Sequence, residues 1–418
     1  MERLQAPVAL EEQSERSGEA DLLIGITSPV SFEKLYAASR AAFQGLASGT
    51  PSLRWVVAYP QESERPAENG AMQQEMPGLR FLPYVPSPEE PAVVASLATH
   101  ASLAAVESIA RSAGVKVCVI ASHDLTAMDS SAIQSLANPI FGNQWDLCMP
   151  IYATGPLDDL LNKGILYPMT RALYGKRIRF PLAPDFGVSA EMLGTLAEGG
   201  ATSRFAGQST LVWPSVESVR IEGRVRQTYL GVRHEAQNEG LDLSTVLGGV
   251  LGSLFDEMDR NASIWQRIRG SQEVATTVSR AVKVNGGDTV DVRPLIDSFE
   301  LGARNLQEVW SLILPPITLL ELKRITRLAP DQFRIPDALW VRIVYDFALA
   351  HHLRNLSRSH VLGALTPLYL GWVASYVLEL GDARSSVVES RLESLAQAYE
   401  AGKPYLLSRW RWPDRFNP

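Results

Sequence analysis

The N-terminal part of the chain alternates short apolar runs with longer amphipathic stretches, and this alternation constrains the fold more than any other feature. The apolar runs begin at Ala20, Leu53, Leu79 and Val115. Runs of this length are typical of buried strands, whereas apolar residues three and four apart, as in SFEKLYAASRAAFQGLAS, are typical of a helix. Strands that alternate with helices predict an α/β fold with a doubly wound, mostly parallel sheet.

The later part of the chain changes character. WDLCMPIYA predicts another strand from Trp145, LLNKGILYPMTRALYG predicts a helix, and KRIRFPL, residues 176–182, predicts a basic strand. From about Leu243 onward nearly every segment carries apolar residues at helical spacing. We therefore expect a leader over residues 1–19, a sheet-containing domain over 20–242 and a helical domain over 243–418.

The composition limits the class of protein. The chain has 418 residues, a net charge of -7, and hydrophobic and charged fractions of 46% and 20%. These values are typical of a soluble globular protein and argue against nucleic acid as a partner. Cys118 and Cys148 lie in apolar runs, which predicts reduced core thiols and a cytoplasmic location. The N-terminus lacks the apolar block of a signal peptide.

One apolar stretch, residues 361–380, is long enough to span a bilayer. Pro367, two glycines and hydroxyl residues interrupt it, and no second candidate span occurs. We therefore expect a buried, kinked core helix here and no membrane span.

The strand VKVCVIA is followed by Ser122, His123 and Asp124. In open α/β sheets ligands bind just beyond the carboxyl ends of parallel strands, so these three residues are candidates for a binding site. A carboxylate at such a strand end suits a hard divalent cation, which prefers oxygen ligands. The alternative is that Asp124 belongs to a turn or caps a helix.

A second group of candidates lies between Tyr167 and Leu193. Its basic residues are Arg171, Lys176, Arg177 and Arg179. They precede Asp185, which stands in a loop bracketed by prolines and is followed by Ser189 at an expected helix start. Guanidinium groups here would suit a carboxylate or phosphate, and Asp185 could position an acceptor hydroxyl. Alternatively, Asp185 caps the helix that follows.

The segment from LANPIFGNQWDLCMPIYA through NKGILYPMTRALYGKRIRFPLAPDFGVSAEML resembles the central signature of a bacterial GT-A glycosyltransferase family. This family is similar to family 2 and is related to the retaining enzymes that make glucosyl-3-phosphoglycerate and mannosylglycerate. KPYLLSRW resembles the end of the family's helical domain, so the resemblance extends from about Ala20 to the C-terminus. It implies a GT-A, Rossmann-like domain followed by an α-helical domain.

The resemblance also implies a metal site. Asp124 matches the second acid of the family's D-S-D-L motif, while Ser122 replaces the first acid and His123 the middle serine. In LGVRHE, His234 matches the family's metal-binding histidine. The implied cofactor is Mg²⁺ or Mn²⁺, held by Asp124 and His234, with Ser122 and His123 beside the nucleotide-sugar donor.

The acceptor side of the resembled motif is only partly retained. Asp185 stands at the catalytic position, but Ala183 and Pro184 replace the two glycines before it, and proline removes a backbone N–H. Arg171, Arg177 and Arg179 would then bind the charged groups of the substrates. The implied function is transfer of a sugar, with retention, from a nucleoside-diphosphate sugar to a small, acidic acceptor.

The motif substitutions leave a second function open, a catalytically degenerate GT-A protein that acts as a binding or scaffolding module. Either protein could form a homodimer through its apolar C-terminal helices. The remaining histidines suggest no site: HHLRNLSRSH, with His351, His352 and His360, lacks neighbouring acids in sequence and is interpreted as a solvated face.

Overall fold

The computed structural model describes residues 20–47, 54–61, 76, 78–85, 97–121, 129–198, 211–232, 242–277, 290–381 and 383–412. The predicted leader, residues 1–19, lies outside these residues. The chain divides into two compact units. Unit 1 comprises the described residues of Met1–Ile151, Leu182–Ala236 and Ala275–Ser279, and unit 2 those of Tyr152–Pro181, Gln237–Val274 and Arg280–Pro418. The units interleave along the chain, because residues 152–181 group with the helices that follow residue 237.

Unit 1 is built on an eight-stranded sheet with the order β3-β2-β1-β4-β6-β5-β7-β8. The strands are β1 (Leu22–Ile26), β2 (Trp55–Pro60), β3 (Leu79–Tyr84), β4 (Val117–Ala121), β5 (Leu147–Ala153), β6 (Phe186–Ser189), β7 (Val225–Val232) and β8 (Ala275–Thr276). β1 pairs in parallel with β2 and β4, and β2 with β3, whereas β6 runs antiparallel to both β4 and β5. All five residues of β1 and of β4 are buried, as expected for central strands covered on both faces.

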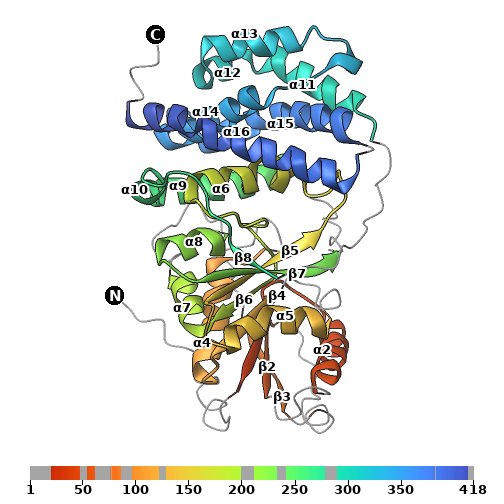
Figure 1. Cartoon of the computed structure of the whole chain (residues 1–418), viewed down its shortest axis with the longest axis vertical. Coiled ribbons are helices and arrows are strands. Elements are labelled where there is room, and N and C mark those ends of the chain that lie inside the picture. The colour runs from red at the N-terminus through yellow and green to blue at the C-terminus, as the bar shows by residue number, and fades with distance from the viewer. Residues whose placement is uncertain are drawn as a thin grey trace. The chain divides into compact units, whose positions relative to one another are not determined.

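Helices cover both faces of this sheet (Figure 1). They are α2 (Phe32–Ala47), α4 (His100–Ser112), α5 (Ser130–Phe141), α7 (Ala190–Glu198) and α8 (Pro214–Arg220). On one face Leu22 and Ile24 of β1 share a buried cluster with Leu35 of α2 and Ile133 of α5. On the other face Val106 of α4 lies against β1, and α4 packs on α7. Unit 1 is therefore a three-layer αβα arrangement.

The close approach of α5 to β6 depends on a glycine. A Cβ atom at Gly187 would lie 2.1 Å from the carbonyl oxygen of Leu136, which belongs to the backbone of α5. Such a contact is far shorter than any real Cβ contact, so a side chain here would push the helix away from the strand. Gly187 thus has a packing role in fixing β6 between β4 and β5.

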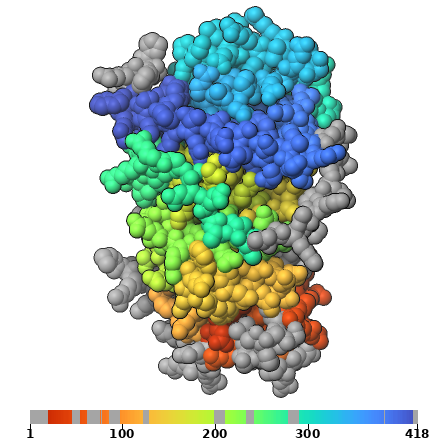
Figure 2. Space-filling view, in the orientation of Figure 1, coloured from red at the N-terminus to blue at the C-terminus, as the bar shows by residue number. Residues whose placement is uncertain are grey.

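Unit 2 is helical. Its helices are the π-helix η2 (Asn162–Leu166), α6 (Tyr167–Tyr174), α9 (Leu243–Arg260), α10 (Ala262–Trp265), α11 (Arg293–Asn305), α12 (Gln307–Ile313), α13 (Pro316–Ile325), the 3-10 helix η3 (Pro330–Gln332), α14 (Asp337–Leu353), α15 (Arg358–Leu380) and α16 (Ser385–Arg411). In its core Trp340 of α14 stacks on Trp372 of α15 with ring centroids 5.5 Å apart, and Trp340 Nε1 donates to the carbonyl of Gly164. The residues of α12 and α13 (cyan in Figure 2) lie at the surface of the face shown.

Two buried lysines of unit 2 donate hydrogen bonds to backbone carbonyls of neighbouring segments. Lys403 Nζ donates to the carbonyls of Ala172 and Leu173 at the end of α6 and to that of Ile268. Lys163 Nζ donates in the same way to the carbonyls of Gly155 and Asp158. Burial lowers the pKa of both ammonium groups to about 8. Each ammonium thus donates its protons to several carbonyl oxygens, as a buried charge requires.

The predicted fold class, a mostly parallel α/β sheet followed by a helical region, is confirmed. Cys118 and Cys148 are free and buried, as predicted. The predicted strand at residues 176–182 is wrong: the segment forms only an isolated bridge between Lys176 and Gln272. In this loop Ile178 and Phe180 are buried, whereas Arg177 and Arg179 form ion pairs with glutamates. The alternation of basic and apolar residues therefore arises from a loop and not from a strand.

Within the described residues, α15 is the one helix whose length and apolar composition would allow it to cross a membrane. Of its most apolar window, 67% is buried in the protein. It packs on α9, α11 and α14 and contains Pro367. This packing agrees with the core helix expected from the sequence.

Candidate functional site

The carboxyl ends of the parallel strands meet at one edge of the sheet in unit 1. Ile26, the last residue of β1, pairs with Ala121, the last residue of β4, and Thr27 N donates to the carbonyl of Ala121 at 3.4 Å. The hydroxyl of Tyr84, at the end of β3, donates to the carbonyl of Ile26 at 2.7 Å. This edge, called here the carboxyl edge, is where α/β sheets bind ligands.

Two buried hydroxyl groups at the carboxyl edge lack partners among the described residues. Thr27 Oγ1 and Ser28 Oγ are both inaccessible to solvent, and neither makes a hydrogen bond there. Ser28 as a whole is 1% exposed. Since buried hydroxyls nearly always find a partner, these two are candidates for contacting a ligand. Neither residue was predicted as a site residue from the sequence, although a hydroxyl residue directly after a buried strand can indicate such a site.

Ser122, His123 and Asp124 continue directly from Ala121, but all three lie outside the described residues. Their predicted roles stay predictions. What the structure adds is the position of the strand from which they follow: β4 lies between β1 and β6, in the middle of the sheet.

Asp185 lies beside this strand end. The antiparallel register pairs Ile120 of β4 with Phe186 of β6, so one step further along both strands Asp185 comes next to Ala121. Asp185 is half-buried. The alternative that it caps the following helix is wrong, because β6 intervenes and Ser189 Oγ accepts the N–H of Met192 at the start of α7.

His234 comes two residues after β7 and lies outside the described residues. The backbone N–H groups of Asp146 and Leu147 both donate to the carbonyl of Arg224, so β5 and β7 begin side by side. β7 therefore ends at the same edge as β4, but three strand positions away. At about 4.8 Å per strand, that is roughly 14 Å between backbones. The strands alone do not bring Asp124 and His234 together, so convergence depends on the segments that follow them.

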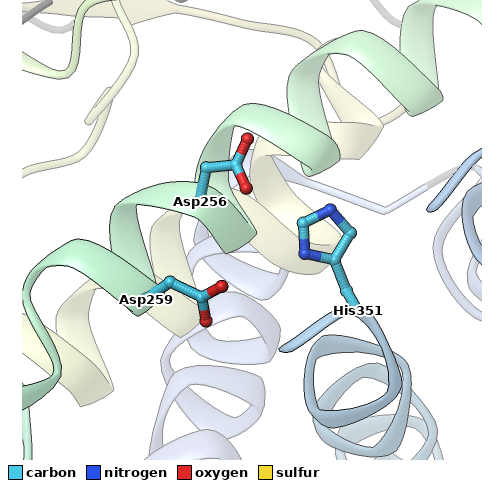
Figure 3. A group of neighbouring side chains, drawn as sticks. All are labelled: Asp256, Asp259 and His351. Carbon is cyan, nitrogen blue, oxygen red and sulfur yellow. The ribbon is translucent and has the colours of Figure 1, made fainter. Parts of the chain in front are cut away.

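The interpretation of HHLRNLSRSH as a solvated face is wrong for His351. This residue is 1% exposed, and its ring faces Asp256 and Asp259 of α9 (Figure 3). One ligand atom of each of the three side chains lies within 4.8 Å of the other two. The next residue, His352, has its Nδ1 2.8 Å from Asp259 Oδ1. Only His360 is exposed, as expected. The acids were missed because they come from a helix distant in sequence.

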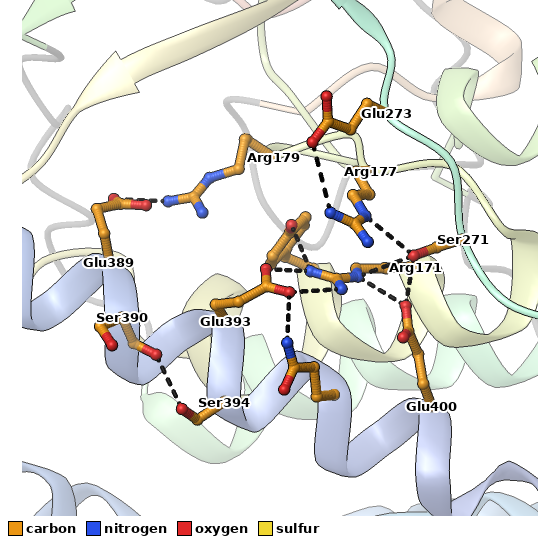
Figure 4. A network of polar contacts seen from close by, with 12 residues as sticks. Arg171, Arg177, Arg179, Ser271, Glu273, Glu389, Ser390, Glu393, Ser394 and Glu400 are labelled. Atoms are coloured by element: carbon orange, nitrogen blue, oxygen red, sulfur yellow. Dashed lines mark hydrogen bonds and ion pairs between the residues drawn. The ribbon is translucent and has the colours of Figure 1, made fainter.

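Arg171 is the centre of a buried ionic network in unit 2 (Figure 4). Its Nη1 and Nη2 donate to Glu393 at 2.5 and 2.9 Å, and its Nε donates to Glu400 at 2.7 Å. Burial by itself would lower the pKa of Arg171, but the hydrogen bonds to Glu393 and Glu400 raise it overall. The Arg171 hydrogen bond in turn lowers the pKa of Glu393 to about 2. The guanidinium is thus neutralised within unit 2 and ties α6 to α16.

The other two predicted arginines are more accessible. Arg177 donates through Nε to Ser271 at 3.1 Å and forms a 3.7 Å ion pair with the exposed Glu273. Arg179 pairs with Glu389 at 2.9 Å and lies over the ring of Tyr167. These are surface ion pairs, which contribute little to stability and can rearrange when a stronger anion binds. Arg177 and Arg179 therefore fit an anion-binding role better than Arg171 does.

His100 lies at the start of α4, where Thr99 caps the helix by accepting the N–H of Ser102. The His100 Nδ1 is 2.8 Å from the carbonyl of Leu196 in α7. The contact joins the two helices on one face of the sheet.

The described residues define an α/β unit whose parallel strands end at one edge of the sheet, together with a helical unit. No protein-family model matches the sequence, and no curated protein matches it. Among the matching solved structures is a protein from Desulfovibrio desulfuricans G20, provisionally assigned as a nucleotide-diphospho-sugar transferase. The match covers 60% of this chain and 98% of that one, with 11% identity and a TM-score of 0.27. A likeness this weak defines neither a family nor an activity.

Proposed function

We propose that the protein is a glycosyltransferase that moves a sugar from a nucleoside-diphosphate sugar to a small, acidic acceptor in the cytoplasm. The observation that carries the proposal is the register of β4 and β6, which sets Asp185 beside the strand end that leads to Asp124. Asp185 at the carboxyl edge, together with an acid on the segment that follows β4, would suit a metal-assisted transfer to a hydroxyl. The sequence resemblance to the GT-A family described above points to the same two residues.

The donor would bind along the carboxyl edge. Thr27 Oγ1 and Ser28 Oγ, buried there without described partners, would hydrogen-bond the nucleotide or its phosphates. Ser122 and His123, which follow β4, would lie next to the diphosphate. Hydroxyl and imidazole groups can accept and donate hydrogen bonds, so they suit a diphosphate as well as a ribose.

The acceptor would be oriented by Asp185, whose carboxylate would accept the hydrogen bond of the reacting hydroxyl. A half-buried carboxylate at a strand end can do this without an additional base. Arg177 and Arg179, which belong to unit 2, stay the residues predicted from the sequence to bind a carboxylate or phosphate of a substrate, since guanidinium groups bind such anions through paired hydrogen bonds. Arg171 is proposed to position Arg177, because both residues donate to the hydroxyl of Ser271.

A divalent ion, Mg²⁺ or Mn²⁺, would neutralise the charge of the leaving diphosphate. Asp124 and His234 would be its protein ligands, a carboxylate oxygen and an imidazole nitrogen that suit Mn²⁺ in particular. Support for this assignment is that β4 and β7 both end at the carboxyl edge. The roughly 14 Å between the two strands requires their following segments to turn toward each other.

Titration calorimetry tests the proposal. We expect UDP-sugars or GDP-sugars to bind the full chain with Mn²⁺ present and to bind at least ten times more weakly without it. Asp124→Asn should abolish the effect of Mn²⁺, whereas Asp297→Asn, an exposed acid on α11, should leave it unchanged. Transfer to glycerate or phosphoglycerate, followed by mass spectrometry of the product, should be lost in Asp185→Asn.

The alternative function predicts a different result. A degenerate GT-A protein that serves as a binding or scaffolding module would bind no nucleotide sugar in a metal-dependent way, even at millimolar ligand. That outcome would overturn the proposed enzyme. Binding without any transfer product would limit the function to that of a nucleotide-sugar-binding protein.

A further inference from the structure

A second cluster of ligand-type side chains lies entirely within unit 2, between α9 and α14. Asp256 and Asp259 are three residues apart on α9, so they project from the same face of the helix. His351 comes from the last turn of α14. One ligand atom of each side chain lies within 4.8 Å of the other two, and Figure 3 shows the imidazole facing both carboxylates.

Two atoms of this cluster are buried and lack hydrogen bonds. His351 Nδ1 is inaccessible to solvent and makes no hydrogen bond among the described residues, although the residue is 1% exposed. Oδ1 of Asp256 is also buried without a hydrogen bond, and its described contact is an ion pair with Arg358 at 2.9 Å. A buried imidazole nitrogen that faces carboxylates without bonding to them is unusual, because such atoms normally find a partner. An ion bound to both the imidazole and the carboxylates would satisfy these atoms.

Two neighbouring side chains, Arg358 and His352, contact the carboxylates of the cluster. Arg358 contacts Asp256 Oδ1, and His352 Nδ1 lies 2.8 Å from Asp259 Oδ1. The ring of His352 is itself fixed by stacking on Trp410, with centroids 4.0 Å apart. Outer contacts of this kind orient metal-binding carboxylates in known sites. Each carboxylate has two oxygen atoms, so these contacts leave it able to bind an ion as well.

The charge balance limits the strength of binding. Two carboxylates face the guanidinium of Arg358, whose Nη2 is also 3.7 Å from Asp259 Oδ2. Arg354 and Arg260 add further positive charge near Asp256. We expect the site to bind more weakly than a closed four-ligand structural site. It remains reachable, since the Asp256 and Asp259 side chains are 13% and 20% exposed.

We propose that Asp256, Asp259 and His351 form a binding site for one zinc ion that links α9 to α14. Imidazole favours a transition metal over Mg²⁺, and two carboxylates with one imidazole are three ligands that leave a fourth position for water. Because the ligands come from two helices, the bound ion stabilises the folded helical unit over the unfolded chain. The site is separate from the metal ligands of the proposed function, Asp124 and His234.

The test uses the full chain with Asp124→Asn and His234→Gln already introduced, so that the metal ligands of the proposed function cannot contribute. Zinc alone is titrated and measured by elemental analysis after equilibrium dialysis. We expect one equivalent of zinc per chain, a rise in melting temperature with zinc, and a visible absorption spectrum when Co²⁺ replaces zinc. Further introduction of Asp256→Asn or His351→Gln should weaken zinc binding at least tenfold. His360→Gln, which alters an exposed histidine of the same region, is the matched control and should change nothing.

Two results overturn the proposal. One is the absence of stoichiometric zinc binding in the Asp124→Asn/His234→Gln background. The other is unchanged zinc binding after Asp256→Asn in a protein that remains folded by circular dichroism. If His351→Gln does not fold, the zinc stoichiometry and cobalt spectrum of the background protein, together with Asp256→Asn, still decide the matter. Neither result bears on whether nucleotide sugars bind at the carboxyl edge.

Discussion

Arg171 and Glu393 form a two-pronged ion pair in which Nη1 lies 2.5 Å from Oε2 and Nη2 lies 2.9 Å from Oε1. The arginine side chain is 1% exposed, whereas the glutamate is 41% exposed. A buried guanidinium is tolerated only if its charge is paired, and here α16 supplies two acids, Glu393 and Glu400. This network makes α6, a helix of eight residues, a fixed part of unit 2.

The first prediction concerns the geometry of that pair. Arg171→Lys keeps the charge but removes the forked donor, so one ammonium must replace bonds to Glu393, Glu400 and Tyr167. We expect a loss of about 2 kcal/mol in the free energy of unfolding, measured with urea. Arg179→Lys is the control, since its more exposed pair with Glu389 should cost less than about 1 kcal/mol. Equal losses for the two variants would contradict the assigned role.

The same pair predicts a pH dependence of stability. The Arg171 hydrogen bond lowers the pKa of Glu393 from 4.5 to about 2 in the folded protein. A carboxyl group whose pKa is lowered by folding stabilises the protein above its unfolded pKa and loses this contribution as the pH falls through its folded pKa. We therefore expect the stability difference between the wild type and Glu393→Gln to be constant above about pH 5. It should shrink between about pH 4.5 and 2. A difference independent of pH over this range would refute the ion pair.

Two of the strands that were predicted correctly can be recognised from burial alone. β1 and β4 consist of apolar residues buried on both faces, and this makes them recognisable without knowledge of the partner strands. β6 was missed, because its four residues, Phe186–Ser189, become a strand only by insertion between β4 and β5. The position of Asp185 beside Ala121 follows from that insertion and could not be derived from the sequence.

The histidine cluster illustrates the same limit. His351 was interpreted from its basic neighbours in sequence, but its environment is determined by α9, which contributes Asp256 and Asp259. Likewise Arg171 was selected as a ligand for an anion, and the anions that it contacts in the structure are Glu393 and Glu400 of α16. Sequence shows which side chains can carry charge. Packing between distant helices decides which charges meet.

Gly187 provides a prediction about the packing of α5 on the sheet. Gly187→Ala would set a Cβ atom 2.1 Å from the carbonyl oxygen of Leu136, and relief requires α5 to move relative to β6. We expect a loss of about 3 kcal/mol in unfolding free energy. Gly194→Ala on α7 is the matched control, since nothing lies within 4 Å of its Cβ position and alanine favours a helix by up to about 1 kcal/mol. Equal unfolding free energies of the two variants in urea would contradict the packing role of Gly187.

A further prediction concerns self-association, for which the sequence suggested the C-terminal helices. Leu312, Ile317 and Leu320 project from α12 and α13 with exposed fractions of 68%, 56% and 55%. Large apolar side chains this exposed favour a protein interface. We expect the wild type to sediment as a dimer and the double variant Leu312→Glu/Leu320→Glu as a monomer. Leu378→Glu, at an exposed position of α15, should leave the dimer intact. A monomeric wild type would refute the dimer.

The last prediction compares two serine-to-alanine variants, one at the carboxyl edge and one elsewhere, in their stability and in their affinity for a nucleotide. Ser28 and Ser39 are both 1% exposed, and the hydroxyls of both are buried without a partner among the described residues. Ser28 follows β1 at the carboxyl edge, whereas Ser39 lies in the middle of α2. Replacing an unsatisfied buried hydroxyl by alanine removes a desolvation cost, so neither variant should lower the unfolding free energy.

Their effects on binding should differ. If the Ser28 hydroxyl contacts the nucleotide, Ser28→Ala loses a hydrogen bond of about 1 kcal/mol, equivalent to a roughly fivefold weaker Kd by calorimetry. Ser39→Ala should bind the nucleotide as the wild type does, because its hydroxyl is remote from the strand end. Equal affinities for all three proteins would show that the buried hydroxyl of Ser28 has no ligand role. The donor would then have to be bound by the residues that follow β4 and β7.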